Sequence, residues 1–354
     1  MFAKSLRLCA SPLFVNHGVL RGQYRKFSAT KLVDYENFMR TKAKVEPPSR
    51  LSTLLDFLEL KGNTLVDPSD RNGLNPFLIP IARDGADQSL LCYMRWPTQR
   101  EEMPLQLVRT TPAGVRLVSL STDNLCHRYA VEMDFRKEPT AAVAIDKLNV
   151  GAHLYTSGDY NTYLNSGKFP KTTEKELNLV LDRYLLTKVG PFPDCYERLA
   201  QNFYDSNNIT SALITCERAG SLFYSWGHPL HFHMKMLRDA GRPEECLEAA
   251  RSAMGLPKWT LASDQADLDE AIKLAGFSKT SIVGEMHAFR ANDPRENDIA
   301  EGHNPIQIIL DQAAHLMDAV ALGAVPGGWE AARAGIAKRY RDAGYPDVAD
   351  FIET

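Results

Sequence analysis

The second half of the chain repeats itself at a fixed spacing, and this repeat limits the folds that the chain can adopt. The segment DSNNITSALITCERA, residues 205–219, aligns with DAGRPEECLEAARSA, residues 239–253, at an offset of 34 residues. A unit of this length accommodates a helix, a tight turn and a second helix. Because one hairpin cannot bury its apolar face alone, hairpins of this kind stack on their neighbours. The repeat therefore predicts stacked helical hairpins.

The first unit resembles a tetratricopeptide repeat in the residues that pack between its helices. Small residues let the two helices approach closely, and larger ones fill the space against the next hairpin. Such a repeat has an aromatic residue, a leucine, a small residue, a second aromatic residue and two alanines, and the chain has Tyr196, Leu199, Ala200, Phe203, Ala212 and Ala219 at the corresponding positions. The resemblance, which covers residues 193–254, implies an α-solenoid.

The other units are less regular. In the second unit Leu230, His233 and Met234 replace the expected aromatic residue, leucine and small residue, although Gly241, Cys246 and Ala253 agree. Residues 341–347 resemble residues 238–244 at an offset of 103, but residues 256–328 match no unit clearly. Two explanations stay open: an array with degenerate units, or a chance similarity between helical hairpins.

The region before the repeats has the pattern of a mixed module. Short runs of β-branched, aromatic and apolar residues, separated by turn signals, predict strands between residues 89 and 134. Residues 105–120 predict a hairpin with a tight turn at Thr111-Pro112-Ala113-Gly114, in which proline fixes one dihedral and Gly114 supplies a positive φ.

These patterns together predict the fold class and the division of the chain. The fold is mainly α, with tetratricopeptide-like (TPR-like) helical hairpins preceded by a small α+β module. We place the module at residues 51–135 and the helical TPR-like domain at residues 136–354. Residues 28–50 contain a Pro-Pro pair that cannot lie inside a helix, and we predict a linker there.

The first 27 residues have the composition of a targeting peptide. They hold five basic residues and no acidic ones, and Ser11, Pro12, Asn16 and His17 interrupt the apolar run that a secretory signal needs. An arginine followed by small residues at 25–29 resembles a matrix-processing site. We therefore predict a mitochondrial presequence and a protein of the mitochondrial matrix; a plastid transit peptide and an ordinary basic arm are the alternatives.

The net charge and the cysteine content of the chain limit the kinds of partner and site that we expect. Loss of residues 1–27 changes the formal net charge from −3 to −8, so a nucleic-acid partner is disfavoured, since such proteins present basic surfaces. The six cysteines form no CxxC pair and are expected to be buried thiols. Since no apolar stretch reaches the length of a membrane span, we expect membrane association only through protein partners.

The chain has none of the common catalytic motifs, and we predict no catalytic residue, no cofactor and no metal. The most suggestive group is His228, His231 and His233, because His228 and His231 would share one helical face. No acidic residue or cysteine has a spacing that completes a metal site there. The acidic residues at 264–270 favour a helix start through the helix dipole and need no catalytic role.

The resemblance to tetratricopeptide-like proteins implies a partner-binding surface. Members of that family mostly bind proteins through the concave face, which is formed by the first helix of each hairpin. Carried over by position, this predicted partner-binding face comprises Asp194, Glu197, Gln201, Tyr204, His228, His231, Lys235 and Arg238. We therefore expect a non-enzymatic adaptor or accessory subunit of a large mitochondrial assembly: the respiratory chain, ATP synthase or the mitoribosome. An organellar RNA-processing or ribosome-associated factor is the alternative.

Overall fold

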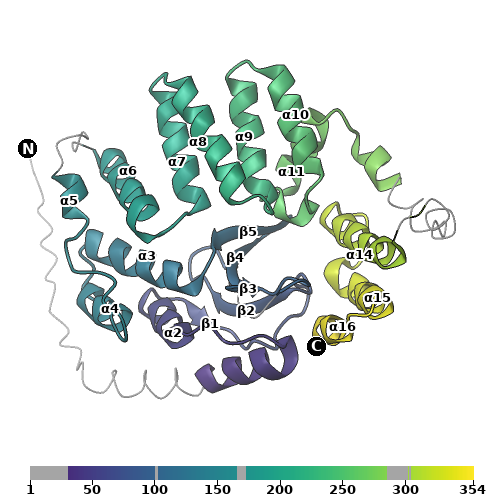
Figure 1. Ribbon diagram of the computed structural model, residues 1–354, viewed down its shortest axis with the longest axis horizontal. Helices are drawn as coiled ribbons and strands as arrows, with labels where there is room; N and C mark the ends of the chain where they lie inside the picture. Colours follow the sequence, from purple (N-terminus) through teal and green to yellow (C-terminus); the bar gives the residue numbers. More distant parts are fainter. Residues whose placement is uncertain (1–30, 100–102, 166–172, 285–301, 303) are drawn as a thin grey trace, which may run out of the picture.

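The computed structural model describes residues 31–99, 103–165, 173–284, 302 and 304–354, and an antiparallel sheet lies at its centre (Figure 1). The strands lie side by side in chain order, and short turns join β2 to β3 and β4 to β5. Tyr93 pairs with Ile79 on one neighbour and with Leu107 on the other. The strands are β1 (Thr64–Leu65), β2 (Leu78–Arg83), β3 (Leu90–Met94), β4 (Gln106–Thr111) and β5 (Gly114–Ser119).

Both faces of this sheet are buried. Successive side chains of a strand point to opposite faces, so Tyr93 and Cys92 of β3 enter two different hydrophobic cores. All five residues of β3 are buried, which explains why this strand has a continuous apolar run rather than an alternating one. The sheet is therefore the middle layer between two sets of helices.

The first core lies between the sheet and the helices that are closest to it in sequence. Residues 31–38 form a helix that continues into the π-turn η1 (Met39–Ala43), and Tyr35 and Met39 on it are fully buried. The linker predicted at residues 28–50 is thus wrong over residues 31–43, because these apolar side chains pack on the core. The other helices are α2 (Leu51–Leu60), α3 (Thr122–Phe135), α4 (Ala141–Leu148), α5 (Asn161–Leu164), α6 (Glu174–Tyr184) and η2 (Leu185–Val189).

The predicted hairpins are present at residues 193–254. They consist of α7 (Pro193–Asp205) with α8 (Ile209–Leu222), and α9 (Gly227–Asp239) with α10 (Pro243–Met254). Equivalent helices of the two hairpins begin 34 residues apart, as the repeat predicts. Ala212 is fully buried between them, and α8 packs against α9.

The second core lies between the other face of the sheet and the end of the chain. Phe77, next to β2, stacks edge-on against Tyr340 of α15, with ring centroids 5.7 Å apart. The α+β module is therefore not a separate unit, because helices from the predicted repeat domain cover one of the two faces of its sheet. The helices of this core at the end of the chain are η3 (Lys258–Thr260), α14 (Pro305–Ala321), α15 (Gly328–Asp342) and α16 (Pro346–Glu353), whereas α11 (Gln265–Leu274) packs with the hairpins in a third core.

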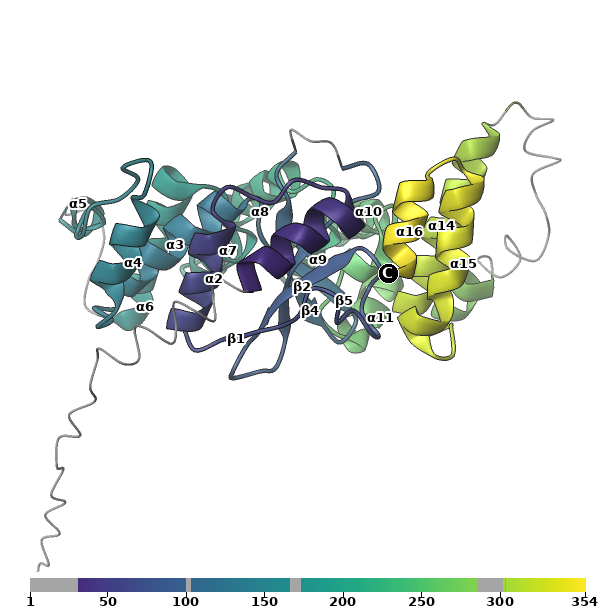
Figure 2. The same cartoon turned by 90° about the horizontal axis from the view of Figure 1, so that it is seen from below.

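The helices follow an arc around the sheet, and the two ends of the arc meet (Figure 1). The N-terminal helix runs across the molecule toward α16 (Figure 2), where the rings of Phe38 and Phe351 lie 6.5 Å apart. Arg71 is 2% exposed and donates from Nη1 to the carbonyl of Phe351 at 2.5 Å. The inside of the arc is occupied by the sheet of the same chain, and the fold is mainly helical around a small antiparallel sheet.

Three tryptophans join the hairpins to the sheet. The ring of Trp96 lies 5.4 Å from that of Trp226 and 5.5 Å from that of Trp259. The side-chain oxygen of Gln106 accepts from the indole nitrogens of Trp96 and Trp226 at 2.9 and 3.1 Å. Trp226 and Trp259 are both buried, so their role is packing.

The turn between β4 and β5 forms where it is predicted, but its glycine has a different purpose. Gly114 is not among the residues with positive φ. A Cβ atom there would lie 2.0 Å from the carbonyl oxygen of Trp259, so only glycine lets η3 approach the strand. The positive φ predicted for Gly114 is therefore wrong.

Two other predictions concern the thiols and the targeting peptide. Cys92, Cys126, Cys195, Cys216 and Cys246 are free and buried, as expected, whereas Cys9 and the targeting peptide lie outside the described residues. Within the described ranges, we find no helix with the length and apolar character needed to cross a bilayer.

Candidate functional site

A polar cleft of about 330 Å³ opens where the two hairpins meet the edge of the sheet. Its walls come from β5, α7, α9 and the start of α11. The side chains that carry charge or can carry it are Arg116, Glu197, His228, His231, Lys235, Asp239 and Asp267. The cleft is therefore of mixed charge, with acidic and basic groups interleaved.

Helix α9 supplies one wall because of the spacing of its polar residues. His228, His231 and Lys235 follow one another at three and four residues, so they lie on one helical face. The start of this helix is held by Gly227, whose amide donates to Thr260 Oγ1 at 3.0 Å. A Cβ atom on Gly227 would lie 2.9 Å from the Cα of Leu261, so glycine is needed for this close contact.

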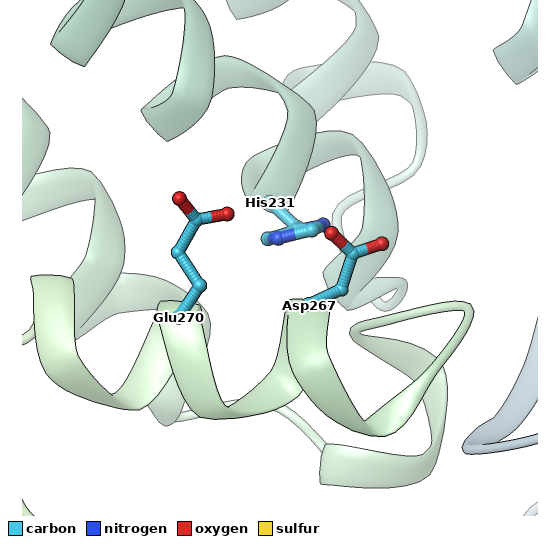
Figure 3. A group of neighbouring side chains, drawn as sticks. All are labelled: His231, Asp267 and Glu270. Atoms are coloured by element: carbon cyan, nitrogen blue, oxygen red, sulfur yellow. The ribbon is translucent and has the colours of Figure 1, made fainter.

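Helix α11 supplies the opposite wall. Its N-cap is Asp264, whose carboxylate accepts from the amide of Asp267 at 2.8 Å and so satisfies one of the free amides at the helix start. The role predicted for the acidic run at the helix start is thus confirmed for Asp264. Asp267 and Glu270 are three residues apart and point from α11 toward α9 (Figure 3).

Glu197 of α7 lies between two basic groups. Its Oε2 accepts from Arg116 Nη2 of β5 at 2.8 Å, and its Oε1 lies 2.9 Å from His228 Nδ1. Burial alone would raise the pKa of Glu197, but the hydrogen bond and charge of His228, with the charge of Arg116, outweigh burial and lower it. Glu197 is therefore held as an anion that joins α7 to both the sheet and α9.

His231 and Lys235 face the acidic residues of α11. Lys235 Nζ lies 3.1 Å from Asp267 Oδ1 and 3.9 Å from Glu270 Oε2. Burial, followed by the nearby charge of His228, lowers the pKa of His231 to about 4. The imidazole of His231 is thus neutral at pH 7, whereas burial of Asp267 beside it is outweighed by the hydrogen bond from Lys235 and nearby charges, which lower the pKa of Asp267.

The structure brings five of the eight residues of the predicted partner-binding face into the cleft. These are Glu197, Gln201, His228, His231 and Lys235.

The other three residues make contacts elsewhere within the chain. Asp194 accepts two hydrogen bonds from Arg128 of α3, at 2.8 and 2.6 Å, and thereby joins α7 to the N-terminal part of the fold. Tyr204 donates to the carbonyl of Asp239 at 2.7 Å, and Arg238 contacts the carboxylates of Asp239 and Glu270. The predicted face is therefore not an open concave surface, because β5 and α3 cover part of it.

Sequence reasoning missed the residues that come from outside the repeat. Arg116 lies on β5, and Ser263 and Asp267 lie beyond the second hairpin. The acidic run at 264–270 was the available signal, but nothing in its spacing relates it to His231. The tertiary structure alone brings these groups together.

Comparison with known proteins identifies the family. Three family models match in succession: the PAB N-terminal model at residues 33–167, the PAB middle domain at residues 193–278 and the PAB C-terminal domain at residues 283–354. The sheet and the first helices thus fall in the first match, and the candidate cleft lies mainly in the second.

A protein of Arabidopsis thaliana, "Protein IN CHLOROPLAST ATPASE BIOGENESIS, chloroplastic", is 32% identical over 319 residues, which cover 89% of each chain. No solved structure matches the chain. Since the three models account for most of the sequence and the relative matches it over nearly its full length, the chain belongs to the PAB family.

Proposed function

We propose that this protein is an assembly factor for the ATP synthase of an organelle. The observation that carries the proposal is the 32% identity, over 89% of both chains, to a protein named for chloroplast ATPase biogenesis. Assembly factors act by holding protein subunits, which agrees with a chain that lacks the common catalytic motifs. The role proposed is therefore non-enzymatic.

The same relative favours the plastid as the location. Its printed name describes it as chloroplastic. The basic, acid-free composition of residues 1–27 suits a plastid transit peptide as well as a mitochondrial presequence. We therefore place this protein in the plastid rather than in the mitochondrial matrix, and a reporter fused to residues 1–27 would test that placement.

The two hairpins, which keep the 34-residue spacing of TPR-like units, are the proposed surface for a subunit of the enzyme. The cleft between α7, α9 and α11 is polar and carries both charge signs. A partner segment with acidic and basic side chains would find opposite charges along it, which favours the correct register over others. The hairpin face thus acts as an adaptor for a charged segment of a protein subunit.

The test is complementation of an Arabidopsis line that lacks the related protein. Expression of this chain should restore the amount of assembled ATP synthase, measured by native gel separation of membrane complexes. If the chain accumulates in plastids and the assembled enzyme stays low, the proposed function is wrong.

A matched pair of variants tests the cleft. Gln201 lines the cleft and donates to Asp205 four residues later at 2.8 Å. Gln307 on α14 makes the same contact with Asp311 at 2.7 Å, away from the cleft. We expect Gln201→Arg to weaken complementation and Gln307→Arg to leave it intact, with similar melting temperatures. Equal complementation by both variants would place the partner surface elsewhere.

A further inference from the structure

Side chains from two facing helices meet at one end of the cleft with the composition of a metal site. His231 comes from α9, and Asp267 and Glu270 come from α11. One ligand atom from each of them lies within 4.8 Å of the other two. The imidazole ring lies between the two carboxylates (Figure 3). In the described part of the chain this is the one group of three or more such residues close enough to share an ion.

The hydrogen bonding of His231 points independently to a ligand. His231 is 3% exposed, and its buried Nε2 atom has no hydrogen-bond partner among the residues that the structure describes. An unpaired buried polar atom is costly, because it loses its bonds to water without replacement. A cation near Nε2 would supply the missing partner.

Besides Arg238, which pairs through Nη1 with Glu270 Oε1, the alternative partner of the carboxylates is Lys235. Its ammonium lies 3.1 Å from Asp267 Oδ1 and 3.9 Å from Glu270 Oε2, so an ion-pair network already balances their charge. However, the side chain is 37% exposed and can turn into solvent at little cost. An ammonium could pair with a neutral imidazole nitrogen only by donating a hydrogen bond to it. Lys235 donates no such bond to Nε2 of His231. The ion pair therefore explains the carboxylates but not the histidine.

We infer that His231, Asp267 and Glu270 bind a divalent first-row transition-metal ion, with Lys235 as its competitor. One imidazole and two carboxylates suit Zn²⁺ or Mn²⁺, and three protein ligands leave further positions open to water. Ligand atoms about 2 Å from a shared ion are at most about 4 Å apart. In tetrahedral geometry such ligand atoms are about 3.4 Å apart, so the three side chains would have to close by up to about 1.5 Å. The inference does not depend on the proposed function.

The first experiment measures Zn²⁺ binding to the full chain, free of any affinity tag, in competition with a chromophoric chelator at pH 7.5. The wild-type protein should bind one equivalent of Zn²⁺. His231→Asn should bind this ion at least about tenfold more weakly, because losing even a residue that only supports a metal ligand lowers the affinity about tenfold. His153→Asn is the control, because His153 is exposed and bonds only to Thr156. Equal affinity of wild type and His231→Asn overturns the site.

A second variant tests the metal site even if His231→Asn folds poorly. Lys235→Gln removes the competing charge from a half-exposed position, so it should fold normally. The affinity for Zn²⁺ should then rise at least about fivefold, because the ammonium no longer repels the divalent ion from a distance of about 4 Å. Unchanged or weaker binding in Lys235→Gln shows that Zn²⁺ does not bind at these carboxylates. Failure here leaves the complementation result unaffected.

Discussion

Helices α7 and α9 are equivalent members of the two hairpins, yet their polar faces do different things. Position by position, at an offset of 34 residues, Asp194, Glu197, Gln201 and Tyr204 of α7 correspond to His228, His231, Lys235 and Arg238 of α9. On α7, Asp194 pairs with Arg128 of α3 and Glu197 with Arg116 of β5. On α9, His231 and Lys235 face the carboxylates of α11.

The difference shows that a repeat determines where a side chain points but not what it meets there. The face of α7 points toward the sheet and α3, so its charges hold the fold together. The corresponding face of α9 points toward α11 and the open cleft, so part of its polar surface is available to a ligand. Four predictions test this comparison, and they follow from the largest expected effect to the smallest.

His231 and its counterpart Glu197 should make the free energy of unfolding depend on pH over different pH ranges. Because burial and His228 lower the pKa of His231 from 6.5 to about 4, the unfolded chain takes up a proton that the folded chain does not. The free energy of unfolding should fall as the pH drops from about 6.5 to about 4, by up to about 3 kcal/mol. The lowered pKa of Glu197 adds a loss only at pH values below its usual 4.5.

Urea denaturation at a series of pH values, with a chelator present, measures this effect. In His231→Gln the loss between pH 6.5 and pH 4 should be smaller than in the wild type. Identical pH profiles for the two proteins would mean that His231 does not stay neutral in the folded chain.

Loss of Asp194 should destabilise the fold. Asp194→Ala leaves Arg128, whose side chain is 12% exposed, without the two hydrogen bonds that it donates to α7. We expect the free energy of unfolding to fall by about 2 kcal/mol, less than for a fully buried pair because Asp194 is partly exposed. Lys235→Ala on α9 is the comparison, and its half-exposed ion pair should contribute about 0.5 kcal/mol. Equal losses would mean that both helix faces are structural.

Overpacking of the first hairpin should cost less. Ala212→Leu adds three carbon atoms at a fully buried position between two helices, and we expect a loss of about 1.5 kcal/mol. Ile214→Ala on the same helix is the control, because Ile214 is 58% exposed and should change stability by no more than about 0.5 kcal/mol. An unchanged melting temperature in Ala212→Leu would contradict the close packing of α7 on α8.

The smallest effect is expected at the outer end of the two helices. Tyr204→Phe removes one hydrogen bond to the exposed carbonyl of Asp239, at a cost of about 0.5 kcal/mol in urea denaturation. Tyr204 and Arg238 changed together to Ala should leave partner binding and helical content nearly unchanged, because both side chains lie outside the cleft and contact Asp239 and Glu270 of the same chain. If the double variant no longer co-purifies with its assembly at normal yield, the partner binds at this end of the hairpins.

The local elements were largely predictable. Residues 172–188 show a hydroxyl residue followed by helical periodicity, and Thr173 and Glu176 form a capping box at the start of α6. The hairpin at 105–120 and the helix start at 264–270 also form as predicted. Each of these depends on residues close together in sequence, whose preferences no distant contact overrides.

The candidate cleft was predictable only in part. Its walls on α7 and α9 follow from the repeat, which aligns the side chains of successive hairpins. The residues of β5 and α11 were missed, since contacts across distant parts of the chain leave no periodic signal. The same reason explains residues 31–43, where the Pro-Pro pair suggested a linker but the helix packs against the core and α16.

The sequence by itself determined the helical hairpins, their spacing and the face on which their polar residues lie, because helix periodicity and capping act within a few residues. Only the tertiary structure decided that the inside of the arc is filled by the sheet, that Asp194 is bound by Arg128, and that His231 meets Asp267 and Glu270. Burial of both faces of the sheet required helices from both ends of the chain. The need to bury both faces of the sheet in shared cores therefore determined which elements lie next to each hairpin.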